Sequence, residues 1–255
     1  MRRIASLGFG AVVAVALVAC MASATLAAEP ADTRRGTPPA NGNPAAPAPT
    51  MEPGVLLWEA AAQGDVDTVR TLLADHPPLE TQPDNRRTPL WVAASEGYTE
   101  VVALLIAAGA NAAVVGTMGG TPLMEAAMAG HTQVLEQMVH AGANLEARHW
   151  RAGTALMQAA LHDRHEAVRT LIALGADVNT ADHHHSTVLM ECIKFGHTES
   201  ARILVAAGAN PNNAARGGVT ALKLAKKSAD PELIRLVEEA IANYKGPAAP
   251  VHTGH

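Results

Sequence analysis

Residues 121–144 read TPLMEAAMAGHTQVLEQMVHAGAN, and a similar stretch recurs along the chain every 33 residues. Each copy opens on threonine, and a leucine follows two positions later. The threonines are Thr88, Thr121, Thr154, Thr187 and Thr220, and the leucines are Leu90, Leu123, Leu156, Leu189 and Leu222, with Leu57 one period earlier. A fixed period of this length is typical of a solenoid, in which each unit packs only against its neighbours.

Each unit predicts two short helices and a projecting hairpin loop. Threonine is a good helix N-cap, and proline suits the first helical position in Thr88-Pro89 because its missing N–H costs nothing there. Gly130 is expected to end the first helix, since glycine adopts a positive φ at little energetic cost. Gly142 is expected to end the second helix. One unit is therefore helix, turn, helix and hairpin.

Composition agrees with this all-α prediction. Hydrophobic residues make up 48% of the 255-residue chain but aromatic residues only 3%. Small side chains suit closely packed helices better than a β-sandwich, which draws on aromatic and β-branched residues. An alanine stands three positions after most repeat leucines, where it lets helices approach closely. Cys192 takes that position in the fifth unit, and we expect it to be a small buried side chain rather than a nucleophile.

The copies at 88–111 and 121–144 resemble ankyrin repeats, and the resemblance extends over residues 55–242. It implies an all-α repeat solenoid of about six units in a domain at residues 54–243. The first and last units depart from the pattern at Asp75-His76-Pro77-Pro78 and at Lys226-Lys227. These departures suit capping repeats, whose outer faces are exposed to solvent. Residues 244–255 are expected to form a flexible tail. Asp163 replaces the glycine of the fourth unit, so a local irregularity is expected there.

The first 28 residues predict an export signal. Arg2 and Arg3 precede an apolar run from Ile4 to Ala19, and small residues follow it. One alternative is a lipoprotein signal that ends before Cys20, because Leu17-Val18-Ala19-Cys20 looks like a bacterial lipobox. Residues 29–53 are rich in proline and alanine, and we expect a disordered linker there. The expected location is the periplasm or the exterior of a bacterium, or the membrane surface if Cys20 is lipidated.

Charge and cysteine content exclude two classes of protein. The formal net charge is −5, which argues against non-specific nucleic-acid binding. Two cysteines rule out a disulfide-built scaffold. We therefore expect a protein partner, no nucleic acid and a monomeric chain.

The resemblance to ankyrin repeats implies binding through the loop tips and the exposed side of the first helices. Apolar and aromatic side chains placed there favour a partner over an inert face. The candidate partner-binding residues are Arg86, Arg87, Trp91, Met118, Glu125, Met128, Trp150, Arg151, Leu161, Glu191 and Phe195. Trp91 also belongs to a series that directly follows each repeat leucine, for which packing between units is the favoured interpretation.

A histidine cluster offers a different hypothesis. His149, His183, His184 and His185 fall on neighbouring loop tips and are candidates for holding a metal ion. Successive loop residues need not converge, so a solvated polar tip is favoured and no cofactor is predicted. His131 and His197 directly follow the glycine that ends a first helix, and we expect them to stabilise that turn.

Two enzyme motifs are incomplete or absent in this sequence. His165-Glu166 begins like a zinc-binding H-E-x-x-H motif, but Arg169 stands where the second histidine is required. No G-x-S-x-G motif is present. We predict a non-enzymatic protein-binding module. The alternatives are an accessory factor for a periplasmic redox enzyme such as catalase, acting through the histidine tip, and an immunity-type inhibitor of a toxin.

Overall fold

A computed structural model describes residues 51–83, 87–150 and 153–246. The predicted signal, Cys20, most of the predicted linker and the last nine residues of the predicted tail lie outside this range, as do Arg86 and Arg151. The first described helix begins at Pro53 and the last ends at Asn243. Within these residues, no helix has the length and apolar content needed to cross a membrane.

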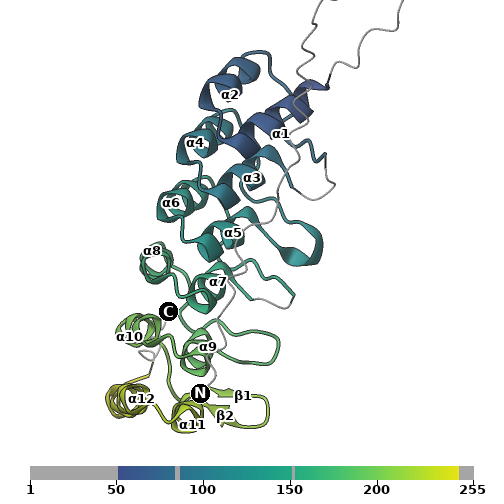
Figure 1. Ribbon diagram of the computed structural model, residues 1–255. Helices are drawn as coiled ribbons and strands as arrows, with labels where there is room; N and C mark the ends of the chain where they lie inside the picture. Colours follow the sequence, from purple (N-terminus) through teal and green to yellow (C-terminus); the bar gives the residue numbers. More distant parts are fainter. Residues whose placement is uncertain (1–50, 84–86, 151–152, 247–255) are drawn as a thin grey trace, which may run out of the picture. The chain divides into compact units, whose positions relative to one another are not determined.

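The described chain folds into six successive helix pairs, which confirms the predicted all-α solenoid (Figure 1). The pairs are α1 (Pro53–Gln63) with α2 (Val66–Leu73), α3 (Pro89–Glu96) with α4 (Thr99–Ala107), α5 (Pro122–Ala129) with α6 (Thr132–His140), α7 (Ala155–Leu161) with α8 (His165–Ala173), α9 (Val188–Phe195) with α10 (Thr198–Ala206), and α11 (Ala221–Ser228) with α12 (Pro231–Asn243). A 3₁₀ turn, η1 (Thr117–Gly119), and a short hairpin of β1 (Ala214–Ala215) and β2 (Val219–Thr220) lie in the loops between pairs.

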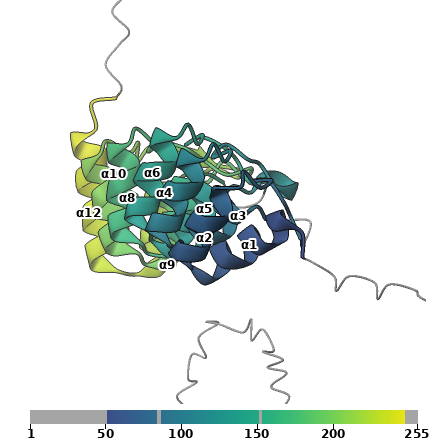
Figure 2. The same ribbon diagram turned by 90° about the horizontal axis from the view of Figure 1, so that it is seen from above.

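The helices form two layers. Each first helix contacts the first helix of the next pair, from α1 through to α11, and the second helices contact one another in the same order from α2 to α12. Viewed from above, the pairs stand one behind another, and the loops between pairs project together on the side of the first helices (Figure 2).

The repeated threonine caps the first helices, as predicted. Its Oγ1 atom accepts a hydrogen bond from the backbone N–H three residues on, at 3.2 Å for Thr88 and Trp91 and at 3.3 Å for Thr121 and Met124. The same bond forms at α9 and α11. Thr154 differs, because its Oγ1 is buried and has no hydrogen-bond partner in the described structure. The α7 helix that it precedes spans only seven residues.

The glycines that end the first helices are left-handed, and Asp163 adopts a left-handed backbone at the equivalent turn of the fourth repeat. Gly64, Gly97, Gly130 and Gly196 all have φ between 69° and 92°. Asp163 must take φ 54°, which is uncommon for a residue with a Cβ. The fourth pair is thus irregular at both the start and the end of α7.

The core lies between successive first helices and beneath the second helices. Leu90, Ala93 and Leu156 are at most 1% exposed. The residues that follow the repeat leucines fill the spaces between repeats, and Met124, Met157 and Met190 are all buried, in accord with the packing interpretation. In the last pair this position belongs to Lys223, which is exposed together with Lys226 and Lys227.

Candidate interaction surface

Two hollows lie in the corner between the first helices and the projecting loops. The larger hollow has a volume of about 570 Å³ and is lined by residues of α7, α9, α11 and the loops at 182–186 and 215–219. The smaller hollow, of about 120 Å³, is lined by residues of α5 with Gly120, Thr121, His149 and Gln158. The larger hollow contains the predicted residues Leu161, Glu191 and Phe195, and the smaller one contains Glu125 and Met128.

Phe195 is the most exposed apolar group of the larger hollow. Its side chain is the last of α9 and is 54% exposed, and the Nζ atom of Lys194 lies 4.9 Å from the ring centroid. Leu161, at the end of α7, is half-buried and lines the same hollow. An apolar ring held open to solvent beside a cation is a suitable anchor point for a partner.

Glu191 was a candidate partner-binding residue, but its carboxylate is engaged within the chain. It is only 8% exposed, and its Oε1 atom accepts a hydrogen bond from the Ser186 hydroxyl at 2.6 Å. The Nζ atom of Lys194 donates to its Oε2 atom at 3.0 Å. The carboxylate of Glu191 therefore fixes the loop before α9 and one end of Lys194.

Trp91, a candidate partner-binding residue, is instead buried, in accord with the packing interpretation favoured for its series. The residue is 6% exposed, and a Cβ added at Gly116 would lie 2.6 Å from its ring. Its indole Nε1 atom is buried without a hydrogen-bond partner in the described structure. Trp58, one period earlier, donates from Nε1 to the carbonyl oxygen of Arg87 at 3.1 Å. Both rings pack between repeats.

The predicted tip residues Met118 and Trp150 lie on adjoining loops. The backbone N–H of Trp150 donates to the carbonyl oxygen of Met118 at 2.9 Å. Trp150 is 56% exposed and Met118 is 64% exposed. Val115, which the sequence analysis did not single out, is 59% exposed on the same loop as Met118. The guanidinium of Arg87 lies 4.0 Å from the carboxylate of Glu125.

Three of the four candidate metal-binding histidines are divided between the two hollows, and the exposed His185 lines neither. His149 lines the smaller hollow, whereas His183 and His184 line the larger one, with ring centroids 3.8 Å apart. The Oδ1 atom of Asp182 accepts backbone hydrogen bonds from His184 and Ser186, both at 2.8 Å, so this carboxylate shapes the loop. In the described part of the chain, no three histidine, cysteine or acidic residues are grouped so as to hold a metal ion.

Polar residues after the first-helix turns fasten the third, fourth and fifth repeats to the one before. The Nε2 atom of His131 lies 3.2 Å from the carbonyl oxygen of Ser95, and Arg164 donates from Nε to the carbonyl oxygen of Met128 at 3.1 Å. The predicted turn-stabilising histidines therefore contact the end of the preceding first helix. These contacts hold the helix ends that border the hollows in register.

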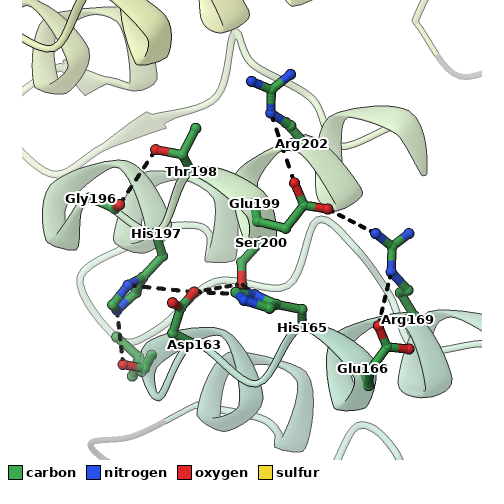
Figure 3. A network of polar contacts seen from close by, with 11 residues as sticks. Asp163, His165, Glu166, Arg169, Gly196, His197, Thr198, Glu199, Ser200 and Arg202 are labelled. Atoms are coloured by element: carbon green, nitrogen blue, oxygen red, sulfur yellow. Dashed lines mark hydrogen bonds and ion pairs between the residues drawn. The ribbon is translucent and has the colours of Figure 1, made fainter.

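The boundary between the fourth and fifth repeats is the most polar of these contacts (Figure 3). The Oδ1 atom of Asp163 accepts from the Ser200 hydroxyl at 3.2 Å and lies 3.4 Å and 3.6 Å from Nδ1 of His165 and His197. Nearby, Arg169 of α8 donates to Glu199 of α10 at 2.8 Å. The left-handed Asp163 thus compensates for its unfavourable backbone by bonding to the next repeat.

Cys192 is fully buried in α9, as predicted. Burial raises the pKa of its thiol to about 12, and the nearby carboxylates of Asp163 and Glu191 act in the same direction. Because the thiolate is the reactive form of cysteine, this side chain is suited to packing and not to nucleophilic attack.

Stacked helix pairs with an open, partly apolar corner define a helical repeat solenoid. A family model described as ankyrin repeats (3 copies) matches residues 57–149 and 147–215, and the chain belongs to the ankyrin-repeat family. Ankyrin repeats generally mediate protein–protein interaction.

A solved structure supports the same assignment. The chain is 31% identical to an ankyrin repeat domain from Acinetobacter baumannii AYE, with a TM-score of 0.68. The match covers 72% of this chain and 96% of that domain. No curated protein matches the chain.

Proposed function

We propose that this chain is an exported, non-enzymatic binding module that holds a partner protein in the larger hollow and on the loop tips. The observation that carries this proposal is the exposure of Phe195 beside Leu161 in a hollow of about 570 Å³. Met118 and Trp150 add exposed apolar groups on the loop tips. Exposed apolar groups that gather on one face favour association with another protein.

The binding acts by shape and charge in this proposal. The buried thiol of Cys192, with its raised pKa, supports a non-enzymatic role. Export is proposed from the sequence of residues 1–28, with the periplasm or the membrane surface of a bacterium as the destination. Mass spectrometry of the mature N-terminus distinguishes cleavage near Ala24 or Ala28 from lipidation of Cys20.

Site-specific photocrosslinking tests the binding surface. A photoreactive benzoylphenylalanine at position 195 should give a discrete adduct of higher mass in cells, because this side chain points into the proposed site. The same group at Leu174, a half-buried apolar position just after α8 on the side of the second helices, is the matched control. Adducts of equal yield at both positions, or none at position 195, would refute the proposed surface.

A further inference from the structure

The acidic groups of the larger hollow are already engaged by the protein itself. The Asp182 carboxylate accepts two backbone N–H groups of its own loop. The Glu191 carboxylate is buried and accepts from Ser186 and Lys194. The charge of Glu191 is therefore balanced by Lys194, whereas Asp182 keeps its negative charge and has one oxygen held by its own loop.

Basic groups at this end of the solenoid remain open to solvent. Arg216 is exposed on the loop that borders α11, and its side chain lines the larger hollow. Lys227 occupies on α11 the position that Lys194 occupies on α9, one period earlier, and it is exposed as well. His183 and His184 complete the rim of the hollow.

The first three helices of the first-helix layer carry acidic side chains and no basic ones. Glu59 on α1, Glu96 on α3 and Glu125 on α5 stand there, and Arg87 lies close to Glu125. The complete chain has a net charge of −5, so the basic end is a local departure from an acidic protein. A local patch of this kind selects partners by charge more than by buried area.

We propose that the larger hollow binds an acidic segment of the partner protein, in which an apolar side chain is flanked by carboxylates. The apolar side chain packs against Phe195 and Leu161, and the carboxylates pair with Arg216 in the lining and with the exposed Lys227 of α11, which lies outside the lining. Arginine is suited to this task because its planar guanidinium pairs with both oxygens of a carboxylate. This inference rests on the proposed protein-binding function and specifies the chemistry of the partner.

Fluorescence anisotropy with three labelled peptides tests the inference on the full chain. The probes are EEELFEEE, QQQLFQQQ and KKKLFKKK, which share one apolar centre and differ in charge. We expect the acidic peptide to bind roughly tenfold more tightly than the neutral one and to weaken as salt rises from about 0.05 to about 0.5 M. The basic peptide should bind most weakly.

A matched pair of double variants locates the site. Arg216→Glu with Lys227→Glu should weaken the acidic peptide by roughly tenfold or more. Arg235→Glu with Lys245→Glu makes the same change of charge on and just after α12, outside the larger hollow, and should have little effect. An equal loss in both variants would show that net charge governs binding and would overturn the site.

Two further outcomes would overturn the acidic partner class. The first is equal affinity for all three peptides, and the second is a preference for the basic peptide. Photocrosslinking at position 195 separates this failure from that of the proposed function. Adducts at position 195 without acidic preference would leave a protein-binding surface with a partner of different charge.

Discussion

The Nε2 atom of His197 lies 3.2 Å from the carbonyl oxygen of Leu161, across the boundary between the fourth and fifth repeats. Helix C-termini leave carbonyl groups without partners inside the helix. His197 supplies such a partner to α7 from the following repeat, and its Nδ1 atom lies 3.6 Å from Asp163. One imidazole therefore couples two repeats at the rim of the larger hollow.

Replacing this imidazole should loosen the boundary. We expect His197→Ala to lower the free energy of unfolding by about 1 kcal/mol, since it removes a half-buried hydrogen bond. Urea denaturation followed by circular dichroism measures the change. His140→Ala is the control, because His140 is exposed and bonds only within its own helix, to the carbonyl oxygen of Glu136. Equal losses in both variants would contradict a coupling role.

The repeat leucines should dominate stability. Leu156 in α7 is 1% exposed, so Leu156→Ala should cost about 2 to 5 kcal/mol through lost burial and a residual cavity. Met118→Ala, at a residue that is 64% exposed, should stay within about 0.5 kcal/mol. Chemical denaturation of both variants checks this ranking. A loss at Leu156 below about 1 kcal/mol would mean that the site is less enclosed than described.

The Cys192 thiol should be unreactive until the fold opens. Its burial and its pKa of about 12 leave almost no accessible thiolate at neutral pH. In a Cys20→Ala background, we expect Ellman's reagent to label the native protein only at the rate at which it unfolds, and to label it rapidly in urea. Cys192→Ala should fold normally, because alanine occupies the equivalent position in the other repeats. Rapid labelling of the native protein would contradict this burial.

The start of α2 should contribute a pH-dependent stabilisation. Asp65 accepts hydrogen bonds from the Thr68 hydroxyl at 2.6 Å and the Thr68 backbone N–H at 3.0 Å, and these lower the pKa of the Asp65 carboxyl from its ordinary 3.8. A lowered folded-state pKa stabilises the fold above pH 3.8, and the stabilisation is lost as pH falls through the folded value. Asp65→Ala should therefore lower Tm at neutral pH.

Thermal denaturation at two pH values isolates this effect. The difference in Tm between the wild-type chain and Asp65→Ala should shrink from pH 7 to about pH 3. Asp65→Asn keeps an N-cap side chain without a carboxyl group, so its Tm should lie between those of the other two proteins at neutral pH. A difference that does not change with pH would exclude the charge of Asp65 as its cause.

Most of the fold follows from spacing in the sequence, and much of the surface does not. Threonine, leucine and glycine at fixed intervals predict where helices begin, pack and end, because these are local or nearest-neighbour properties. The burial of Trp91 depends on how the following loop crosses it, and that of Glu191 depends on pairing with Ser186 and Lys194. Both are tertiary contacts that the pattern of one repeat does not encode.

The sequence pattern did not predict that a basic side chain lines the larger hollow, for the same reason. Arg216 lies in a loop between repeats, and only the folded chain brings that loop beside α9 and α11. A comparison of charge at equivalent repeat positions would have drawn attention to Lys194 and Lys227. The aromatic residues Phe195 and Trp150 were identifiable because a large apolar group at an exposed repeat position stands out within the unit.

The exposed Lys223 of α11 has a consequence for assembly. A solenoid whose last surface matched its interior would accept another molecule end to end, and head-to-tail contacts that do not close into a ring produce filaments. Lys223 stands where the third, fourth and fifth repeats bury methionine, so a second molecule stacked there would have to strip water from its ammonium group. This face therefore disfavours polymerisation.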